Sequence, residues 1–250
     1  MRDIITAKLA EIEKHENVRI IYAVESGSRA WGFASPDSDY DVRFIYVRPE
    51  EFYLKLERTR DVIEWQLDET LDINGWDLQK TLRLLHKSNP TVFEWDQSPV
   101  VYKITPEWVT IRNKINECFS MKAVLYHYIN ISRGDYNEYL KNDIVKLKKY
   151  FYAIRPILAA EWVLDKKCPP PILFTELVEA KLPTELLPII EALLAQKAET
   201  PELGENKRID ILNEYIENSV TSLITAAGNL PNDSVSDWNT LNELFLSIVS

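Results

Sequence analysis

The sequence predicts an α+β protein in which a small mixed β-sheet flanked by helices is followed by an α-helical C-terminal domain. Two observations carry this prediction. Strand-like apolar segments alternate with helical ones up to about residue 104, and beyond Thr105 the pattern is helical. The chain has 250 residues, enough for one large or two ordinary domains, and its 46% hydrophobic content predicts a packed core. We therefore expect one domain over residues 1–104 and a helical domain over residues 105–250.

The N-terminal elements follow from apolar periodicity. Ile5, Leu9 and Ile12 share one face of a first helix, which ends near residues 15–17. Gly75 is expected to end a strand, so that the next helix begins at Trp76. The further elements expected in this domain are strands over 18–24, 40–47, 62–67 and 70–74, and helices over 50–58, 76–87 and from Pro90 onward.

The C-terminal part is expected to consist of helices joined by short connections. Pro156 lies inside one of them and is expected to kink or divide it, because proline lacks the N–H that an interior helical position donates. The three prolines at 169–171 predict a stiff connector. The expected helices cover residues 107–118, 123–132, 139–164, 184–199, 209–226 and 235–249.

Composition excludes several classes of protein. The net charge of −10 argues against an extended surface for nucleic acid, although one local basic strip would suffice to hold an RNA terminus. Two cysteines make neither a disulfide framework nor a zinc site. The N-terminus lacks the apolar core of a signal peptide, and no apolar run is long enough to span a membrane. We expect a cytoplasmic protein without membrane partners.

The most informative motif joins two of the predicted strands. Gly27-Ser28 is followed, after ten residues, by Asp39-Tyr40-Asp41-Val42. Side chains alternate along a strand, so Asp39, Asp41 and Arg43 share one face. Paired carboxylates suit hard divalent cations, and small residues with accessible N–H groups suit phosphates. A solvated turn around Pro36 is the alternative reading, but it does not explain acids that continue into the strand.

This motif resembles the signature of the DNA polymerase beta-like nucleotidyltransferase superfamily. Within it, the run is similar to predicted nucleotidyltransferases related to the minimal nucleotidyltransferases and to a bacterial RNA-repair-associated group. The resemblance covers about residues 18–175. The other stretches that carry it are residues 71–78, 88–95, 98–99 and 146–156.

The resemblance implies that residues 1–104 form a catalytic domain that uses an NTP with Mg²⁺ or Mn²⁺. Asp39 and Asp41 would bind the metal ions, and a third acid would complete the set and act as base. Asp72, between Leu71 and Ile73 on a predicted strand, is the preferred third acid. Asp77 is the competitor, although an acid at the start of a helix also gains from the helix dipole.

Several residues are candidate nucleotide contacts. Gly27 and Ser28 match the positions that cradle the β- and γ-phosphates in the superfamily. Arg29 and Arg43 suit phosphate geometry, although Arg43 is equally expected to pair with a carboxylate. On the predicted helix over 139–164, helical spacing places further basic and aromatic candidates on one stripe, for which a solvated basic face is the alternative: Lys141, Lys148, Tyr152 and Arg155.

The expected function is transfer of NMP from an NTP to an acceptor hydroxyl, with release of pyrophosphate. An RNA end is the first acceptor by resemblance, a protein side chain the second and a small hydroxylated molecule the third. A non-catalytic nucleotide-binding regulator and a partner-binding module are the alternatives from other classes. The sequence leaves the base of the NTP and the oligomeric state open.

Overall fold

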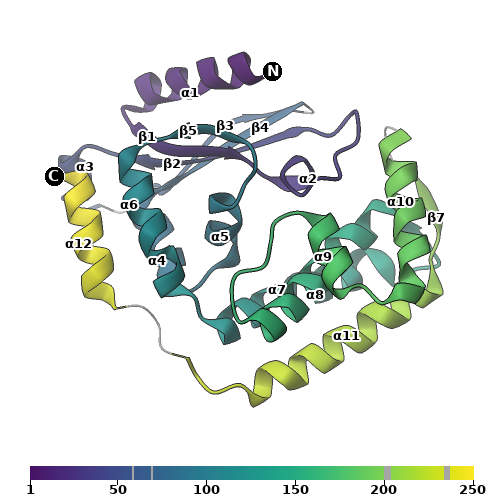
Figure 1. Cartoon of the computed structure of the whole chain (residues 1–250). Coiled ribbons are helices and arrows are strands. Elements are labelled where there is room, and N and C mark those ends of the chain that lie inside the picture. Colours follow the sequence, from purple (N-terminus) through teal and green to yellow (C-terminus); the bar gives the residue numbers. More distant parts are fainter. Residues whose placement is uncertain (58, 69, 200–203, 234–236) are drawn as a thin grey trace. The chain divides into compact units, whose positions relative to one another are not determined.

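The computed structural model describes residues 1–57, 59–68, 70–199, 204–233 and 237–250 (Figure 1). Its contacts divide the chain into two compact units, each discontinuous in sequence. The first unit comprises Met1–Ala30, Asp39–Phe119 and Val235–Ser250, and the second comprises Trp31–Ser38 and Ser120–Ser234. This division differs from the expected boundary at residue 104. The helix that follows residue 104 and the last helix of the chain both pack in the core of the first unit.

The first unit contains a five-stranded sheet and its covering helices. Its strands are β1 (Arg19–Glu25), β2 (Tyr40–Val47), β3 (Val62–Leu67), β4 (Leu71–Asp77) and β5 (Val101–Ile104). Its helices are α1 (Arg2–Glu16), α2 (Gly27–Ala30), α3 (Glu50–Tyr53), α4 (Leu78–His86), α5 (Pro90–Asp96), α6 (Pro106–Ile115) with the 3₁₀ turn η1 (Asn116–Cys118), and α12 (Trp238–Val249). Helix α3 is shorter than predicted, and residue 58, the predicted end, lies outside the described residues, as do 235 and 236 of the last predicted helix.

The sheet is mixed, with strand order β3-β4-β2-β1-β5. Strands β2 and β4 run parallel, and every other neighbouring pair is antiparallel. Two parallel strands need a crossover connection between them. Here the chain leaves β2, forms the edge strand β3 and returns as β4 between β3 and β2. The predicted small mixed sheet flanked by helices is confirmed.

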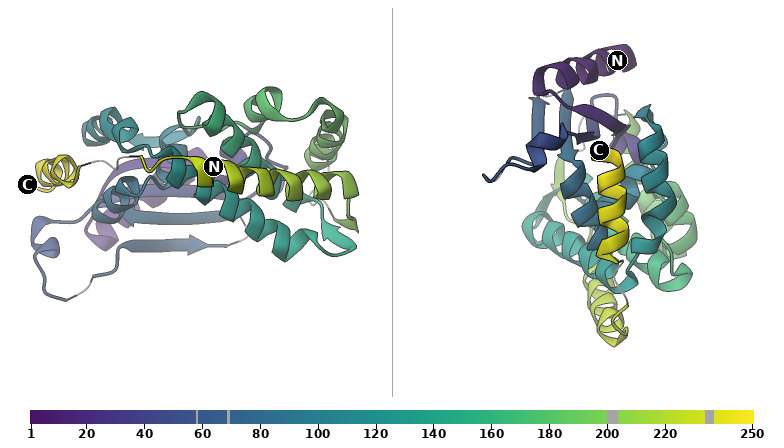
Figure 2. Two further views of the ribbon diagram at one scale, coloured as in Figure 1. Left: turned by 90° about the horizontal axis from the view of Figure 1, so that it is seen from below. Right: turned by 90° about the vertical axis from the view of Figure 1, so that its left-hand side faces the viewer.

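Both faces of the sheet are covered. Helix α1 packs its predicted face, Ile5, Leu9 and Ile12, on one side, where these residues are buried with Phe44 and Ile73. Helices α4, α5, α6 and α12 cover the other side (Figure 1). Helix α12, the yellow C-terminal helix, lies beside α4 on this second face, opposite α1 (Figure 2). The last helix of the chain therefore completes the core of the first unit.

Gly75 does not end its strand, contrary to the prediction. Strand β4 continues to Asp77, and α4 begins at Leu78. A Cβ at Gly75 would lie 2.1 Å from the Phe44 ring of the neighbouring strand, so the position serves close packing instead of a break. The predicted helix start at Trp76 was therefore two residues early.

The second unit is mostly helical. Its elements are α7 (Met121–Asp135), the π-helix η2 (Tyr136–Leu140), β6 (Ile144–Lys146), α8 (Lys148–Lys166), α9 (Phe174–Lys181), the 3₁₀ turn η3 (Thr184–Leu186), α10 (Leu187–Glu199), β7 (Glu205–Lys207) and α11 (Asp210–Asn229). Helices α7, α8 and α11 pack on one another, and α9 packs on α8. None of the described helices is long and apolar enough to cross a bilayer.

The predicted helix over 139–164 is wrong at its N-terminal end. Residues 144–146 form β6, which pairs antiparallel with β7, and α8 begins only at Lys148. Ile144 consequently lies exposed outside the helical core. Pro156 is buried inside α8, which runs through it to Lys166, so the proline does not divide the helix.

The segment Trp31–Ser38 belongs to the second unit although it interrupts the Gly-Ser to Asp motif. The Phe33 ring packs on Phe151, with ring centroids 5.1 Å apart, and edge-to-face on Phe174. The Phe174 N–H donates to the Trp31 carbonyl at 2.9 Å. These contacts anchor the loop of the motif on α8 and α9.

Candidate active site

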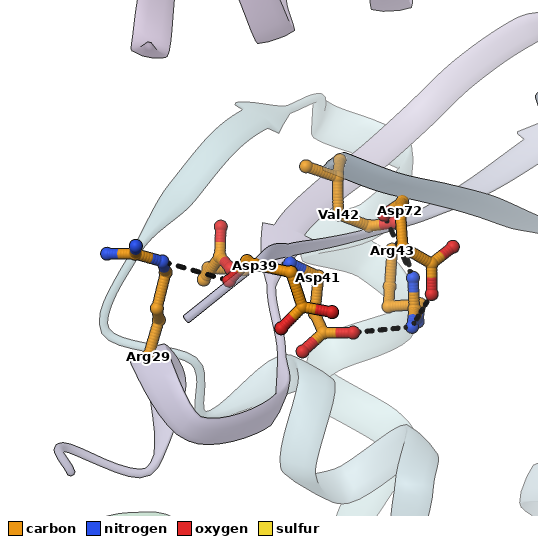
Figure 3. A network of polar contacts seen from close by, with 7 residues as sticks. Arg29, Asp39, Asp41, Val42, Arg43 and Asp72 are labelled. Atoms are coloured by element: carbon orange, nitrogen blue, oxygen red, sulfur yellow. Dashed lines mark hydrogen bonds and ion pairs between the residues drawn. The ribbon is translucent and has the colours of Figure 1, made fainter. Parts of the chain in front are cut away.

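The site is built at the first residues of β2 and β4. Asp41 and Asp72 are direct partners in the parallel register of these strands, so their side chains project from the same face (Figure 3). Asp39 comes immediately before β2 and has an exposed side chain. Asp72, the predicted third acid, is far from Asp41 in the sequence, but the pairing of β2 with β4 places the two side by side.

A guanidinium lies between the two paired carboxylates. Arg43 Nη2 donates to Asp41 Oδ1 at 2.8 Å and to Asp72 Oδ2 at 2.7 Å, and Nη1 donates to the Asp72 carbonyl at 3.1 Å (Figure 3). Each of the three side chains is about one-fifth exposed, from 18% to 21%. Of the two roles expected for Arg43, the structure therefore displays the pairing with carboxylates.

Gly27 brings the backbone against the same carboxylate. Its φ is +59°, and a Cβ at this position would lie 2.0 Å from Asp41 Oδ2, so only glycine fits without a shift. Ser28 follows at the first turn of α2, and its side chain is buried. Gly27 thus adjoins Asp41, and Ser28 follows it directly in the chain.

Arg29 is fixed on the other side of the strand start. Its Nε donates to the Asp39 carbonyl at 2.9 Å, and its guanidinium lies 3.8 Å from the centroid of the Tyr40 ring. The hydrogen bond and the stacking together hold a positive charge beside the backbone of Asp39 (Figure 3).

The Asp41 carboxyl has a raised pKa. Burial is the largest cause, Arg43 opposes it, and the charges of Asp39 and Asp72 raise it further. The mutual repulsion means that the three acids form one electrostatic cluster. A bound cation would relieve this repulsion and favour the ionised form.

Asp77, the competing third acid, has a different place and a different use. It lies five residues after Asp72 on β4, hence on the opposite face and roughly 16 Å along the strand. It is the N-cap of α4, where Oδ1 accepts the Gln79 N–H at 2.7 Å and Oδ2 accepts the Tyr53 hydroxyl at 2.9 Å. Of the two candidates, only Asp72 is brought to Asp41.

The remaining candidates lie on α8 of the second unit. Lys148 begins the helix, and Tyr152 contacts Trp31 edge-to-face with centroids 5.6 Å apart. Arg155 is 3% exposed, and its guanidinium lies 4.5 Å from the Trp31 ring centroid. Lys141, predicted for the same stripe, precedes β6 and is not part of α8.

Sequence reasoning missed Glu25, the last residue of β1. Its carboxylate is 1% exposed and accepts the Asp41 backbone N–H at 2.8 Å and the Tyr102 hydroxyl. Burial raises the pKa of Glu25, and the hydrogen bonds from Tyr102 and Asp41 counter that rise. The available signal was a single acid at the end of an otherwise apolar strand, two residues before Gly27.

Comparison with protein families decides the relationship of this chain. The family model RlaP, described as the RNA repair pathway DNA polymerase beta family, matches residues 1–247. The chain belongs to the RlaP family. The match includes the region in which the polymerase beta-like resemblance was seen, and it extends over the helices for which the sequence showed no resemblance.

One relative of this RlaP-family chain is a Bacillus subtilis (strain 168) protein with the name Uncharacterized protein YcgL. The two are 45% identical over 253 residues, which is 100% of this chain and 96% of the relative. A solved nucleotidyltransferase-like protein from Exiguobacterium sibiricum 255-15 is 16% identical with a TM-score of 0.32, covering 90% of this chain and 77% of that one. The spectinomycin adenyltransferase AAD(9) from Enterococcus faecialis, solved with ATP and spectinomycin, is 15% identical with a TM-score of 0.40. The match covers 90% of this chain and 98% of the adenyltransferase.

The donor set of this RlaP-family site fits a divalent cation. Two carboxylate oxygens, from Asp41 and Asp72, converge on a single positively charged nitrogen, and Asp39 lies two residues before Asp41 in the chain. Oxygen ligands of this kind suit Mg²⁺ and Mn²⁺. Among the described residues no group of three acids, histidines or cysteines is already arranged around a metal position. In this structure the Arg43 guanidinium occupies the position between the Asp41 and Asp72 carboxylates.

Proposed function

We propose that this protein is a nucleotidyltransferase that uses Mg²⁺ or Mn²⁺ to move NMP from an NTP to an acceptor hydroxyl, releasing pyrophosphate. The observation that carries the proposal is the convergence of the Asp41 and Asp72 carboxylates on one cationic nitrogen, against the backbone of Gly27. Membership of a family described as a DNA polymerase beta family supports the same class of reaction.

In the proposed reaction the acceptor oxygen bonds to the α-phosphorus, and the bond from that phosphorus to the pyrophosphate oxygen breaks. Asp72 takes the proton of the acceptor hydroxyl, a role for which its position beside Asp41 suits it. Asp39, Asp41 and Asp72 would hold the metal, which when bound would neutralise charge on the triphosphate and on the attacking oxygen. Positioning and charge compensation account for the rate, because no covalent enzyme intermediate is needed.

Further residues of the chain bind the triphosphate in this proposal. Gly27 and Ser28 hold the β- and γ-phosphates, since Gly27 adjoins Asp41 and Ser28 follows it at the start of α2. Arg29 and Arg43 provide positive charge, Arg43 after it has left the two carboxylates. Lys148, Tyr152 and Arg155 are proposed as contacts from α8, with Arg155 the least exposed of the three.

An RNA end is the proposed acceptor. The description of the family as an RNA repair pathway family supports this choice. The net charge of −10 favours a short contact with a terminus over a long footprint, because each neutralised phosphate needs a nearby cation. A protein side chain is the alternative acceptor, to be separated by experiment.

A nucleotide-binding regulatory protein is the second candidate function. The specific observation in its favour is the Arg43 guanidinium, which satisfies both carboxylates where a cation would lie. If that ion pair persists when nucleotide binds, the fold would bind NTP without turnover.

The test is transfer from each of four α-labelled NTPs with Mg²⁺, offered the protein alone, total RNA or a protein extract. Asp41→Asn is the disabling variant, and Asp37→Asn, an exposed acid of the same loop, is the matched control. The proposal predicts label in RNA that is lost in Asp41→Asn and kept in Asp37→Asn. Label in protein would change the acceptor, and Mg²⁺-dependent NTP binding without transfer would favour the regulatory candidate.

A further inference from the structure

The most unusual group near the site is a carboxylate that the proposed chemistry does not use. Glu25 ends the apolar strand β1 and is 1% exposed. Burying a carboxylate is unfavourable unless hydrogen bonds compensate it. A glutamate at this place therefore needs its hydrogen-bond partners, and these partners connect three strands of the sheet.

Glu25 joins the strand that carries Asp41 to the edge strand β5. One carboxylate oxygen, Oε1, accepts the backbone N–H of Asp41 at 2.8 Å. The other, Oε2, accepts the hydroxyl of Tyr102. The Ser98 hydroxyl donates to the Glu25 carbonyl at 2.6 Å, so the backbone of Glu25 is itself held.

The Asp41 N–H needs this side chain because the β1–β2 ladder ends here. The Ser26 N–H donates to the Asp41 carbonyl at 2.8 Å, and in an antiparallel pair the Ser26 carbonyl would normally accept the Asp41 N–H in return. The chain instead turns away at Gly27, and the Ser26 carbonyl accepts the N–H of Ala30 at 3.4 Å. The Glu25 carboxylate supplies the acceptor that the turn removes.

The backbone of Asp41 is thus fixed on both sides while its carboxylate faces Gly27 and Arg43. We propose that Glu25 is the positioning residue for Asp41, holding this metal-binding carboxylate at the point where strand pairing can no longer do so. In this proposal Glu25 is not itself a ligand of metal or nucleotide. It acts through the Asp41 amide, as outer-shell groups do in metal sites.

The effect of Glu25 on metal binding rests on the proposed function, which makes Asp41 a metal ligand. The contact between Glu25 and the Asp41 amide is independent of metal and of turnover. A hydrogen bond from an amide to a carboxylate shifts the amide proton strongly, so the Asp41 amide reports on Glu25 in the metal-free protein.

The experiment compares the full-length wild type with Glu25→Gln and Tyr102→Phe by three measurements. They are the Asp41 amide proton shift without metal, the affinity for Mn²⁺ alone by electron paramagnetic resonance, and the split between the apparent KM for Mn²⁺ and kcat. Glutamine keeps the size and one acceptor oxygen, so we expect the fold to be retained. Glu13→Gln is the matched control, because Glu13 Oε1 accepts the Ile20 N–H at 2.7 Å near the other end of β1.

We expect Glu25→Gln to move the Asp41 amide upfield and to weaken Mn²⁺ binding by roughly 10-fold or more, with kcat largely restored at saturating metal. Tyr102→Phe should give a smaller change of the same sign, and Glu13→Gln none. An unmoved Asp41 amide, or Mn²⁺ affinity within a factor of about two of the wild type, would overturn the inference. If the wild type binds no Mn²⁺ while the Asp41 amide moves, the proposed function fails and the positioning contact stands.

Discussion

Asp41 and Asp72 are direct partners across the parallel pairing of β2 and β4, and one nitrogen of Arg43 binds both carboxylates. Two acids that repel each other are thereby held on one face with a cation between them. The guanidinium compensates the charge of the two acids that we propose as metal ligands. The consequences can be tested one residue at a time.

Asp72→Asn and Asp77→Ala should have opposite effects. Loss of the proposed base should lower the transfer rate roughly 10²–10⁴-fold with little change in the free energy of unfolding. Asp77→Ala removes the α4 cap and leaves the Tyr53 hydroxyl without its acceptor, which should cost about 1–3 kcal/mol while activity at low temperature is kept. Transfer rates and urea unfolding curves of both variants check the prediction. The assignment is contradicted if Asp77→Ala loses activity while Asp72→Asn loses stability.

Arg43→Gln should destabilise the metal-free protein, by about 1–3 kcal/mol, because it leaves two neighbouring carboxylates without their cation. Added Mn²⁺ should recover more stability in the variant than in the wild type, since the ion no longer competes with a guanidinium. Thermal unfolding with and without Mn²⁺ measures both effects. Equal shifts in the two proteins would show that Arg43 does not occupy the metal position.

Gly27→Ala should disturb both stability and metal binding. The positive φ and the 2.0 Å approach of a Cβ to Asp41 Oδ2 require the backbone or the carboxylate to move, at a cost of about 1–3 kcal/mol. Gly228→Ala is the matched control, because a Cβ there meets nothing within 4 Å and alanine is the better helix former. Chemical denaturation and Mn²⁺ binding of both variants check the prediction, which fails if Gly27→Ala behaves like Gly228→Ala.

Glu161→Gln should stabilise the protein at pH 8 but not at pH 4. Burial raises the pKa of Glu161 from 4.5 to about 7, and Lys181 counters part of that rise. Because the folded state binds this proton more tightly than the unfolded state, the free energy of unfolding falls as pH rises from about 4.5 to about 7. Glutamine does not titrate, so the variant keeps its free energy of unfolding over this pH range. The difference in free energy of unfolding between variant and wild type should therefore grow by about 1–3 kcal/mol, a figure already lowered for the partial exposure of the site. Denaturant unfolding at several pH values measures it, and parallel curves would refute it.

Sequence periodicity was sufficient for the longer elements. The strand at Tyr40–Val47 and the buried face of α1 were predicted residue by residue, because a long regular pattern leaves one solution. Elements of three to eight residues were missed where the pattern was too short to separate from loops. These are α2, β5, β6, β7 and α9. Gly75 was misread because the residue that requires it, Phe44, lies on another strand.

The sequence by itself determined the motif: Gly27, Asp39 and Asp41 are local to one turn and one strand, so their grouping, and the resemblance to polymerase beta-like nucleotidyltransferases that it carries, needed no tertiary structure. Only the tertiary structure decided which later acid joins them, since strand register brings Asp72 to Asp41 and sends Asp77 to cap α4. It also decided that Arg43 lies between carboxylates and that Glu25 holds the Asp41 backbone. Such contacts depend on where a ladder ends and which strand lies next to it, and neither is encoded in local spacing.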